Sequence, residues 1–335
     1  MTSLALWRQA SGLLASAFLF ITATGCQPPP ALDCRLAEIT CVGLVTDASG
    51  LNDAGLNEQA WGVLASLRSD EVVANYIESV ETSDYAKNLA YFADHGYDFV
   101  VASGYSVSEH ALSMAGDYPE ISFIMLGRAP VEQDSPPNLA GVVFPEELAG
   151  FWAGTIAAHY SQTGIVGAVF AHPALPPVVA YSSGFVTATQ GVQSNVVYLE
   201  SYRFADTLIN PDWGAEQALT LEEQGADVLF AYGGATGLAA LEKASSQIIG
   251  VETDLARRYP HFKARVLASI LFDPSVLREI ILSGKISQPV YQAGYIIAWG
   301  ETTPPESLTT VIGEAPPPTE YLEIPLPEDG FDEDE

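Results

Sequence analysis

Residues 42–64 read VGLVTDASGLNDAGLNEQAWGVL, and this stretch carries the unit from which the fold is built. It begins as an apolar strand and ends as an amphipathic helix. The turn between them holds a dense run of small and polar residues: Thr46, Asp47, Ser49, Gly50, Asn52, Asp53, Gly55 and Asn57. A strand that leads directly into a helix is the repeating unit of a parallel sheet, so the stretch favours an α/β fold.

The same alternation continues along the 335 residues. Apolar runs predict strands at 42–47, 71–79, 98–104 and 121–127, then at 139–144, 164–171, 195–202, 227–234 and 247–254. Helical patterns lie between them at 53–67, 83–95, 107–117, 146–160, 178–191, 212–224 and 236–245. Continuous apolar strands separated by helices are typical of parallel sheets covered on both faces. Two such series predict two doubly wound lobes, completed by a strand at 265–272, a helix at 274–284 and a strand at 295–301.

The N-terminus predicts export. A weakly positive start precedes an apolar run from Leu13 to Ile21, too short to span a bilayer and typical of a signal peptide over residues 1–25. The following Ala23-Thr24-Gly25-Cys26 resembles a bacterial lipobox, in which Cys26 becomes the lipidated first residue. The alternative is ordinary cleavage that leaves a free cysteine. Residues 26–41 then form a lipidated tether that opens with a stiff, proline-rich segment.

Two further cysteines, Cys34 and Cys41, remain outside the cytoplasm. An even pair in an oxidising compartment predicts a disulfide, worth about 2.5 kcal/mol on the chain-entropy account. The alternative is a pair of free thiols.

Charge and motifs exclude several function classes. The formal net charge is −29, from 13 Lys and Arg against 42 Asp and Glu, which disfavours binding to nucleic acid or to anionic lipids. There is no G-x-S-x-G elbow, no Walker lysine in the glycine-rich YGGATG at 232–237, and no Cys/His zinc spacing. The sequence therefore predicts no enzyme, no cofactor and no metal site.

Hydrogen-bonding residues gather where the predicted strands end. In open parallel sheets, ligands bind beyond the carboxyl ends of the strands. Asp47, Asp53 and Asn57 could cap the first helix, but capping needs only one or two side chains, and the surplus predicts a ligand rich in hydrogen-bonding groups. Gly234 either lets the chain turn or lets backbone N–H groups approach that ligand.

These residues resemble those of the basic membrane protein family, the lipid-anchored nucleoside-binding proteins of ABC transporters. LVTDASGLNDAGLNEQAW is similar to the family's opening motif, V-T-D-x-G-G-x-x-D-x-S-F-N-Q-x-x-W. Further similar blocks lie at 85–105, 138–170, 176–185, 225–241 and 248–254. The resemblance covers about residues 42–300 and implies a type I periplasmic-binding-protein fold, in which two lobes joined by crossing strands close on a ligand.

The resemblance also implies site residues. Asp47, Asp53 and Asn57 match the polar residues of the family's first motif, and Tyr181 is the match for one of two aromatic residues that stack on a purine base.

Three positions depart from the family pattern. Leu56 stands where the other stacking aromatic belongs, and Glu252 stands where the family has a ribose-binding aspartate. Phe272 replaces a lysine that contacts the ribose, and it is a candidate for the missing aromatic wall. These departures leave the identity of the solute open.

The expected organisation follows from both lines of reasoning. The N-terminal lobe comprises 42–144 and about 265–292, the C-terminal lobe 145–264 and about 293–312, and residues 313–335 form an acidic, proline-rich tail expected to be disordered. The expected function is that of a lipid-anchored, extracytoplasmic protein that passes a small nucleoside-like solute to an ABC permease in the membrane. The alternatives are a membrane-anchored sensor or surface protein of the same fold, and an extracytoplasmic hydrolase.

Overall fold

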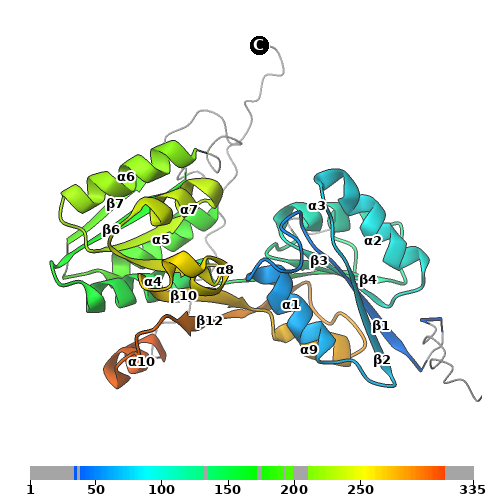
Figure 1. Cartoon of the computed structure of the whole chain (residues 1–335). Helices are drawn as coiled ribbons and strands as arrows, with labels where there is room; N and C mark the ends of the chain where they lie inside the picture. The colour runs from blue at the N-terminus through cyan, green and yellow to red at the C-terminus, as the bar shows by residue number, and fades with distance from the viewer. Residues whose placement is uncertain are drawn as a thin grey trace, which may run out of the picture. The chain divides into compact units, whose positions relative to one another are not determined.

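The computed structural model describes residues 34–35, 38–130, 135–171, 176–191, 193–198 and 210–313. The predicted signal peptide, Cys26 and the tail beyond residue 313 lie outside the described residues. Within the described part, two six-stranded sheets are each covered by helices on both faces (Figure 1). None of the described helices combines the length and the apolar character needed to cross a membrane.

The first sheet has the strand order β11-β5-β4-β3-β1-β2, and its paired strands are all parallel. Its strands are β1 (Thr40–Val45), β2 (Val72–Ile77), β3 (Phe99–Ser103), β4 (Ser122–Leu126), β5 (Leu139–Val143) and β11 (Val290–Gln292). Helices α1 (Leu56–Ala65) and α9 (Val276–Leu282) cover one face, and α2 (Tyr85–Asp94) and α3 (Tyr105–Met114) cover the other. We call this sheet with its helices the first lobe.

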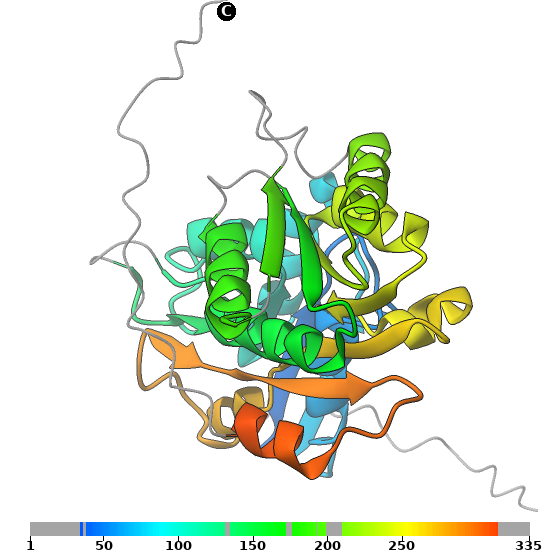
Figure 2. The same ribbon diagram turned by 90° about the vertical axis from the view of Figure 1, so that its left-hand side faces the viewer.

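The second sheet has the order β12-β10-β9-β8-β6-β7, with only the edge strand β12 antiparallel. Its strands are β6 (Ile165–Phe170), β7 (Gln193–Tyr198), β8 (Val228–Tyr232), β9 (Gln247–Val251), β10 (Val266–Asp273) and β12 (Gly294–Trp299). Helices α4 (Glu146–Tyr160) and α5 (Pro176–Ala188) cover one face, and α6 (Pro211–Glu223), α7 (Gly234–Lys243) and α8 (Leu255–Arg258) cover the other. This is the second lobe, and α10 (Glu306–Gly313) packs against its α4 (Figure 2).

One expected lobe boundary is wrong. The sequence predicts that residues from about 265 belong to the first lobe, but β10 lies in the second sheet, between β9 and β12. The apolar run 266–271 is buried and pairs with β9 before the chain crosses to the first lobe, and β12 later adds the edge of the second sheet. The chain therefore passes between the sheets after β5, after β10, and between β11 and β12.

Some local features differ from the expected elements. Helix α1 begins at Leu56 rather than at residue 53, because residues 51–55 form a turn in which Ala54 has a φ of 53°. The short elements β11, α8 and α10 were not expected. Cys34 and Cys41 are joined by a disulfide, as the cysteine count suggested, next to the start of β1.

Glycines bring α4 and α5 into close contact. A Cβ atom added at Gly184 of α5 would lie 2.0 Å from the backbone oxygen of Glu147, and one at Gly150 of α4 would lie 2.0 Å from that of Tyr181. Neither backbone can move without separating the two helices. Because Tyr181 belongs to α5, this contact also fixes where its side chain lies.

Gly184→Ala is expected to destabilise the protein by about 1–3 kcal/mol, the usual cost of overpacking a tight contact. Gly62→Ala is the matched control, since Gly62 is an exposed residue of α1 with nothing within 4 Å of its added Cβ. That control should leave stability unchanged or raise it by about 0.5–1 kcal/mol. Urea unfolding followed by circular dichroism measures both, and equal effects of the two substitutions would contradict the packing argument.

Candidate functional site

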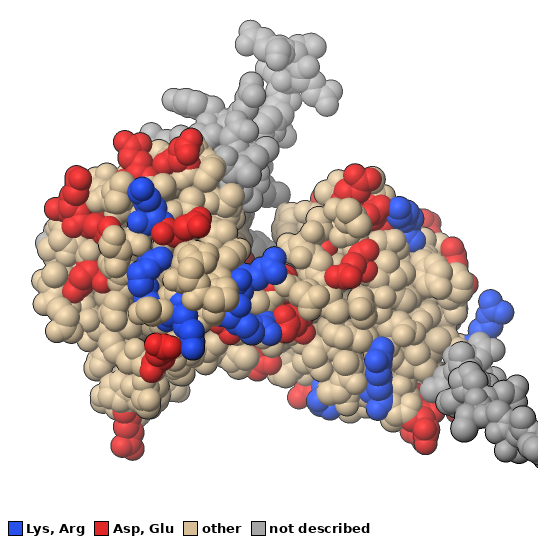
Figure 3. Space-filling view, in the orientation of Figure 1, with Lys and Arg blue, Asp and Glu red and all other residues tan. Residues whose placement is uncertain are grey.

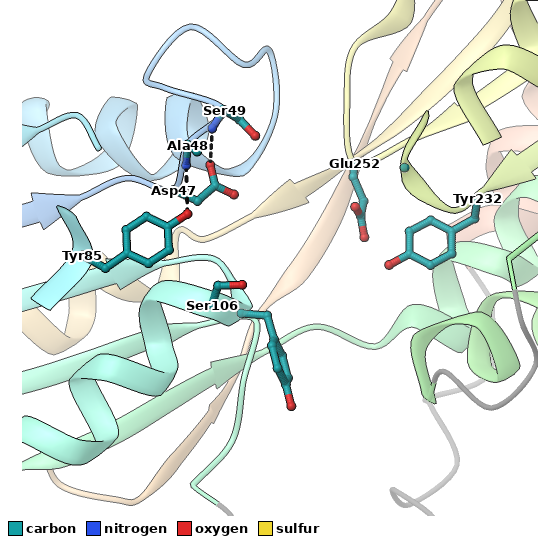
Figure 4. Close-up of a pocket in the computed structure, with 9 residues that line it drawn as sticks. Asp47, Ala48, Ser49, Tyr85, Ser106, Tyr232 and Glu252 are labelled. Atoms are coloured by element: carbon teal, nitrogen blue, oxygen red, sulfur yellow. Dashed lines mark hydrogen bonds between the residues drawn. The ribbon is translucent and has the colours of Figure 1, made fainter. Parts of the chain in front are cut away.

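A cavity of about 640 Å³ lies at the carboxyl ends of strands from both sheets (Figure 4). The first lobe lines it with Asp47, Ala48, Ser49, Tyr85, Tyr105 and Ser106, and the second lobe with Tyr232, Gly234 and Glu252. Figure 4 shows the side chains of Asp47 and Glu252 on opposite sides of this space. Its volume is within the range of pockets that hold small molecules.

Asp47 is held in position by its own turn and by α1. Its Oδ1 accepts hydrogen bonds from the backbone N–H of Ser49 at 3.0 Å and from Nδ2 of Asn57 at 2.9 Å. Asn57 is buried, and it also donates to the backbone oxygen of Gly50 at 3.0 Å. No described residue donates to Oδ2 of Asp47, so this oxygen is available to a ligand. Asn57 does not line the cavity, and its role in the structure is to orient Asp47.

Asp53 caps α1 and does not line the cavity. Its carboxylate accepts from the backbone N–H groups of Gly55 at 2.8 Å, Asn57 at 3.1 Å and Glu58 at 3.2 Å. Burial raises the pKa of Asp53, and these three hydrogen bonds partly oppose that effect. Capping by one acidic side chain therefore accounts for part of the polar run at 46–57.

Glu252 is the second carboxyl group of the cavity. Its Oε1 accepts a hydrogen bond of 3.1 Å from the hydroxyl of Tyr181, which is also 3.1 Å from the hydroxyl of Tyr295. Burial raises the pKa of Glu252 to about 7, and the negative charges of Glu146 and Asp47 add to the effect. Hydrogen bonds from Tyr181 and Tyr232 act in the opposite direction. Near neutral pH the carboxyl group of Glu252 is therefore partly protonated. When protonated it donates a hydrogen bond as well as accepting one, and when ionised it only accepts.

A strained backbone contact joins the turn after β1 to the loop after β9. Among the described residues, Ala54 and Glu252 are the two non-glycine residues with positive φ, 53° and 66°. The N–H of Asp254 donates to the backbone oxygen of Ala54 at 2.9 Å, and a Cβ added at Gly55 would lie 2.8 Å from the backbone oxygen of Glu252. Left-handed backbone costs about 1–3 kcal/mol at such residues and is concentrated at functional sites.

An ion pair reinforces this contact at the surface. The guanidinium of Arg257 in α8 donates to both carboxylate oxygens of Glu58 in α1, with Nη2 2.7 Å from Oε2. Nη1 of Arg258 donates to the backbone oxygen of Asn52 at 3.0 Å. In Figure 3, acidic side chains are spread over the visible face of both lobes, and the fewer basic ones also lie on both lobes, some of them near α8.

The other predicted site residues divide between core and cavity. Gly234 lines the cavity at the start of α7. Tyr181 is fully buried behind Glu252 and reaches the site only through its hydroxyl. Phe272 is buried between Phe144 and Tyr295, with ring centroids 4.4 Å and 5.5 Å away, and it does not line the cavity.

Sequence reasoning placed Tyr105 at a strand end but assigned none of the three tyrosines of the cavity wall to the binding site. Tyr85 begins α2, Tyr105 begins α3, and Tyr232 ends β8. Tyr85 also accepts a hydrogen bond from the N–H of Ala48 at 3.2 Å, which ties the wall to the Asp47 turn. The sequence feature that could have identified these tyrosines is their position after or at the carboxyl end of a predicted strand.

Glu252→Gln is expected to change how stability depends on pH. Since the pKa of Glu252 is about 7 in the folded protein and 4.5 ordinarily, the folded state binds more protons between these values, and wild-type stability falls as pH rises through that window. The glutamine variant lacks this loss, so at pH 8 it should exceed the wild type by up to about 3 kcal/mol, with the difference disappearing near pH 4.5.

Urea unfolding between pH 4.5 and 8 measures this difference, and exposed Glu120→Gln is the control. A difference between Glu252→Gln and wild type that stays constant with pH would contradict the assignment.

Comparison with known proteins gives a family model and relatives that belong to the same family. Residues 40–303 match the family model Bmp, described as ABC transporter substrate-binding protein PnrA-like. The chain is 25% identical over 274 residues to basic membrane protein A1 of Borrelia garinii, covering 79% of this chain and 78% of that protein. It is 23% identical over 208 residues to the ABC transporter nucleoside-binding protein BmpA of Lactococcus lactis, covering 61% of this chain and 58% of that protein.

Solved structures agree on the fold. A solute-binding protein of an ABC transporter system from Conexibacter woesei superimposes with a TM-score of 0.66 at 21% identity, covering 82% of this chain and 94% of that chain. A transcriptional activator of the comK gene from Bacillus halodurans gives 0.63 at 19% identity, covering 82% and 95%. The two lobes thus have the type I periplasmic-binding-protein fold. Because the family model spans most of its length, the chain belongs to the PnrA-like Bmp family of ABC transporter substrate-binding proteins.

Proposed function

We propose that this protein captures a nucleoside-like solute between its lobes, outside the cytoplasm, and delivers it unaltered to an ABC permease. The observation that carries the proposal is the cavity in which Asp47 and Glu252 face each other between tyrosine side chains. A nucleoside offers what such a cavity recognises, namely a flat base and a sugar with neighbouring hydroxyl groups. The relative from Lactococcus lactis, which is named as nucleoside-binding, supports the same class of solute.

The carboxyl groups would hold the sugar. Oδ2 of Asp47 has no donor among the described residues, and it lies on a side chain that Asn57 already orients. Glu252 approaches from the second lobe, so a solute that bonds to both groups is stabilised only when the lobes stand close together. Preferential binding to that arrangement is the physical basis of lobe closure.

Tyrosines would take the place of the family's aromatic walls. The family's first stacking position is occupied by Leu56, and Tyr181 and Phe272 are buried behind the cavity. Tyr105 and Tyr232 line the cavity with rings that are not fully buried, and Tyr85 lines it as a buried residue. Each well-placed stack contributes about 0.5–1.5 kcal/mol, so two of them would account for base recognition without the usual residues.

The remaining parts of the proposal concern location. Cys26 would carry a lipid that anchors the protein to the membrane, and the segment up to residue 41 would act as a tether to the first strand. Mass spectrometry of the protein purified from membranes, before and after Cys26→Ser, tests the anchor directly.

Asp47→Ala is expected to weaken solute binding about tenfold or more, since it removes a charge-assisted hydrogen bond. A thermal-shift screen with purine and pyrimidine nucleosides, free bases and sugars identifies the solute, and calorimetry then compares wild type, Asp47→Ala and the exposed control Asp70→Ala. Chromatography of the released solute checks that it is intact. Unchanged affinity in Asp47→Ala, or recovery of a free base, would count against the proposal.

A further inference from the structure

Arg128 is not one of the residues that line the cavity, but it contacts Tyr105, which is. It follows β4 at the carboxyl edge of the first sheet, the edge from which Asp47 and Tyr105 also come. Its Cζ is 4.5 Å from the ring centroid of Tyr105, a cation–π contact. Tyr105 is a cavity-lining residue whose surface is 64% exposed, so the stacked pair stands at the boundary between cavity and solvent.

The guanidinium of Arg128 has buried donors without acceptors. Its Nε and Nη1 are buried, and no described residue accepts a hydrogen bond from either atom. Five other described arginines donate to protein oxygens: Arg68, Arg257, Arg258, Arg265 and Arg278. A guanidinium keeps its charge, and burying its donors without an acceptor costs free energy. A bound anion would recover that free energy by displacing the groups that cover Nε and Nη1.

Only an anionic solute would need a positively charged group near this cavity. The residues that line it include two carboxyl groups and no lysine or arginine, so a neutral solute would find its acceptors without help from a cation. An anionic solute would be repelled by Asp47 unless a positive charge lay nearby. The stacked guanidinium supplies that charge in a planar form suited to carboxylate or phosphate oxygens.

We propose that Arg128, held against the Tyr105 ring, is a specificity-determining residue that binds a carboxylate or phosphate group carried by the solute. This inference rests on the proposed function, and it narrows the solute from nucleoside-like molecules in general to their anionic members. Tyr105 positions the cation, and Asp47 and Glu252 bind the neutral part of the same solute.

The test compares matched ligands that differ in one anionic group. Calorimetry measures the affinity of wild type for adenosine, guanosine and uridine, for their 5′-monophosphates, and for their 5′-carboxylates. The same titrations use Arg128→Gln, Arg128→Lys and the control Arg278→Gln, which removes the same charge from an exposed residue of α9. Circular dichroism confirms that each variant is folded, and Arg128→Lys retains a cation if the glutamine variant does not fold.

The expected result is that wild type binds an anionic member more tightly than its parent nucleoside. Arg128→Gln should weaken binding of that member by about tenfold or more and change the parent by less than about twofold. The affinity of Arg128→Lys for the anionic member should lie between those of wild type and Arg128→Gln. The affinity of Arg278→Gln should equal that of wild type. Whether the phosphate or the carboxylate series shows the effect identifies the anion.

Two results would overturn the inference in distinguishable ways. If a parent nucleoside binds and Arg128→Gln leaves all affinities unchanged, the inference fails and the proposed function stands. If neither parents nor anionic members bind, the proposed function fails and the inference fails with it.

Discussion

The site depends on the backbone contact between Ala54–Gly55 in the first lobe and Glu252–Asp254 in the second. Only a residue without a Cβ fits at Gly55, because an added Cβ would lie 2.8 Å from the backbone oxygen of Glu252. Both left-handed non-glycine residues of the described chain lie in this contact. The contact sets the direction in which Glu252 leaves β9, and hence whether its carboxyl group faces Asp47. The ion pair of Arg257 with Glu58 is exposed and adds little stability, so the backbone geometry is the main constraint.

The polar run after β1 serves this contact more than it serves a ligand. Asp53 caps α1, Asn57 orients Asp47, and the N–H of Leu51 donates to Glu78 at 2.7 Å. Each of these side chains satisfies a backbone or side-chain group that a tight turn would otherwise leave unpaired. One carboxylate oxygen, Oδ2 of Asp47, is left without a described donor. The surplus of hydrogen-bonding residues is therefore the support that holds a single acceptor in a fixed position.

Sequence patterns predicted the strands and long helices well, because buried parallel strands are continuous apolar runs with glycine or polar residues at their ends. They predicted β10 as a strand but placed it in the wrong lobe, because the choice of sheet depends on which sheet has a free edge. They did not predict the short elements β11, α8 and α10. In the site, position at a strand end identified Asp47, Gly234 and Glu252. Side-chain direction decided the rest: Phe272 is buried away from the cavity, Tyr85 is a core residue that still reaches the cavity wall, and Tyr105 and Tyr232 are the more exposed tyrosines of that wall. No local pattern distinguishes these cases.

The electrostatics of the cavity follow from the burial of Glu252. Its pKa of about 7 means that near neutral pH the carboxyl group is protonated for a large part of the time. In that state it donates a hydrogen bond as well as accepting one, and it adds no negative charge to that of Asp47. Near neutral pH the cavity is therefore less negative than its two carboxyl groups alone would make it, although the protein as a whole carries a net charge of −29. Protonation of Glu252 would thus reduce the repulsion felt by a negatively charged solute, which the role proposed for Arg128 requires.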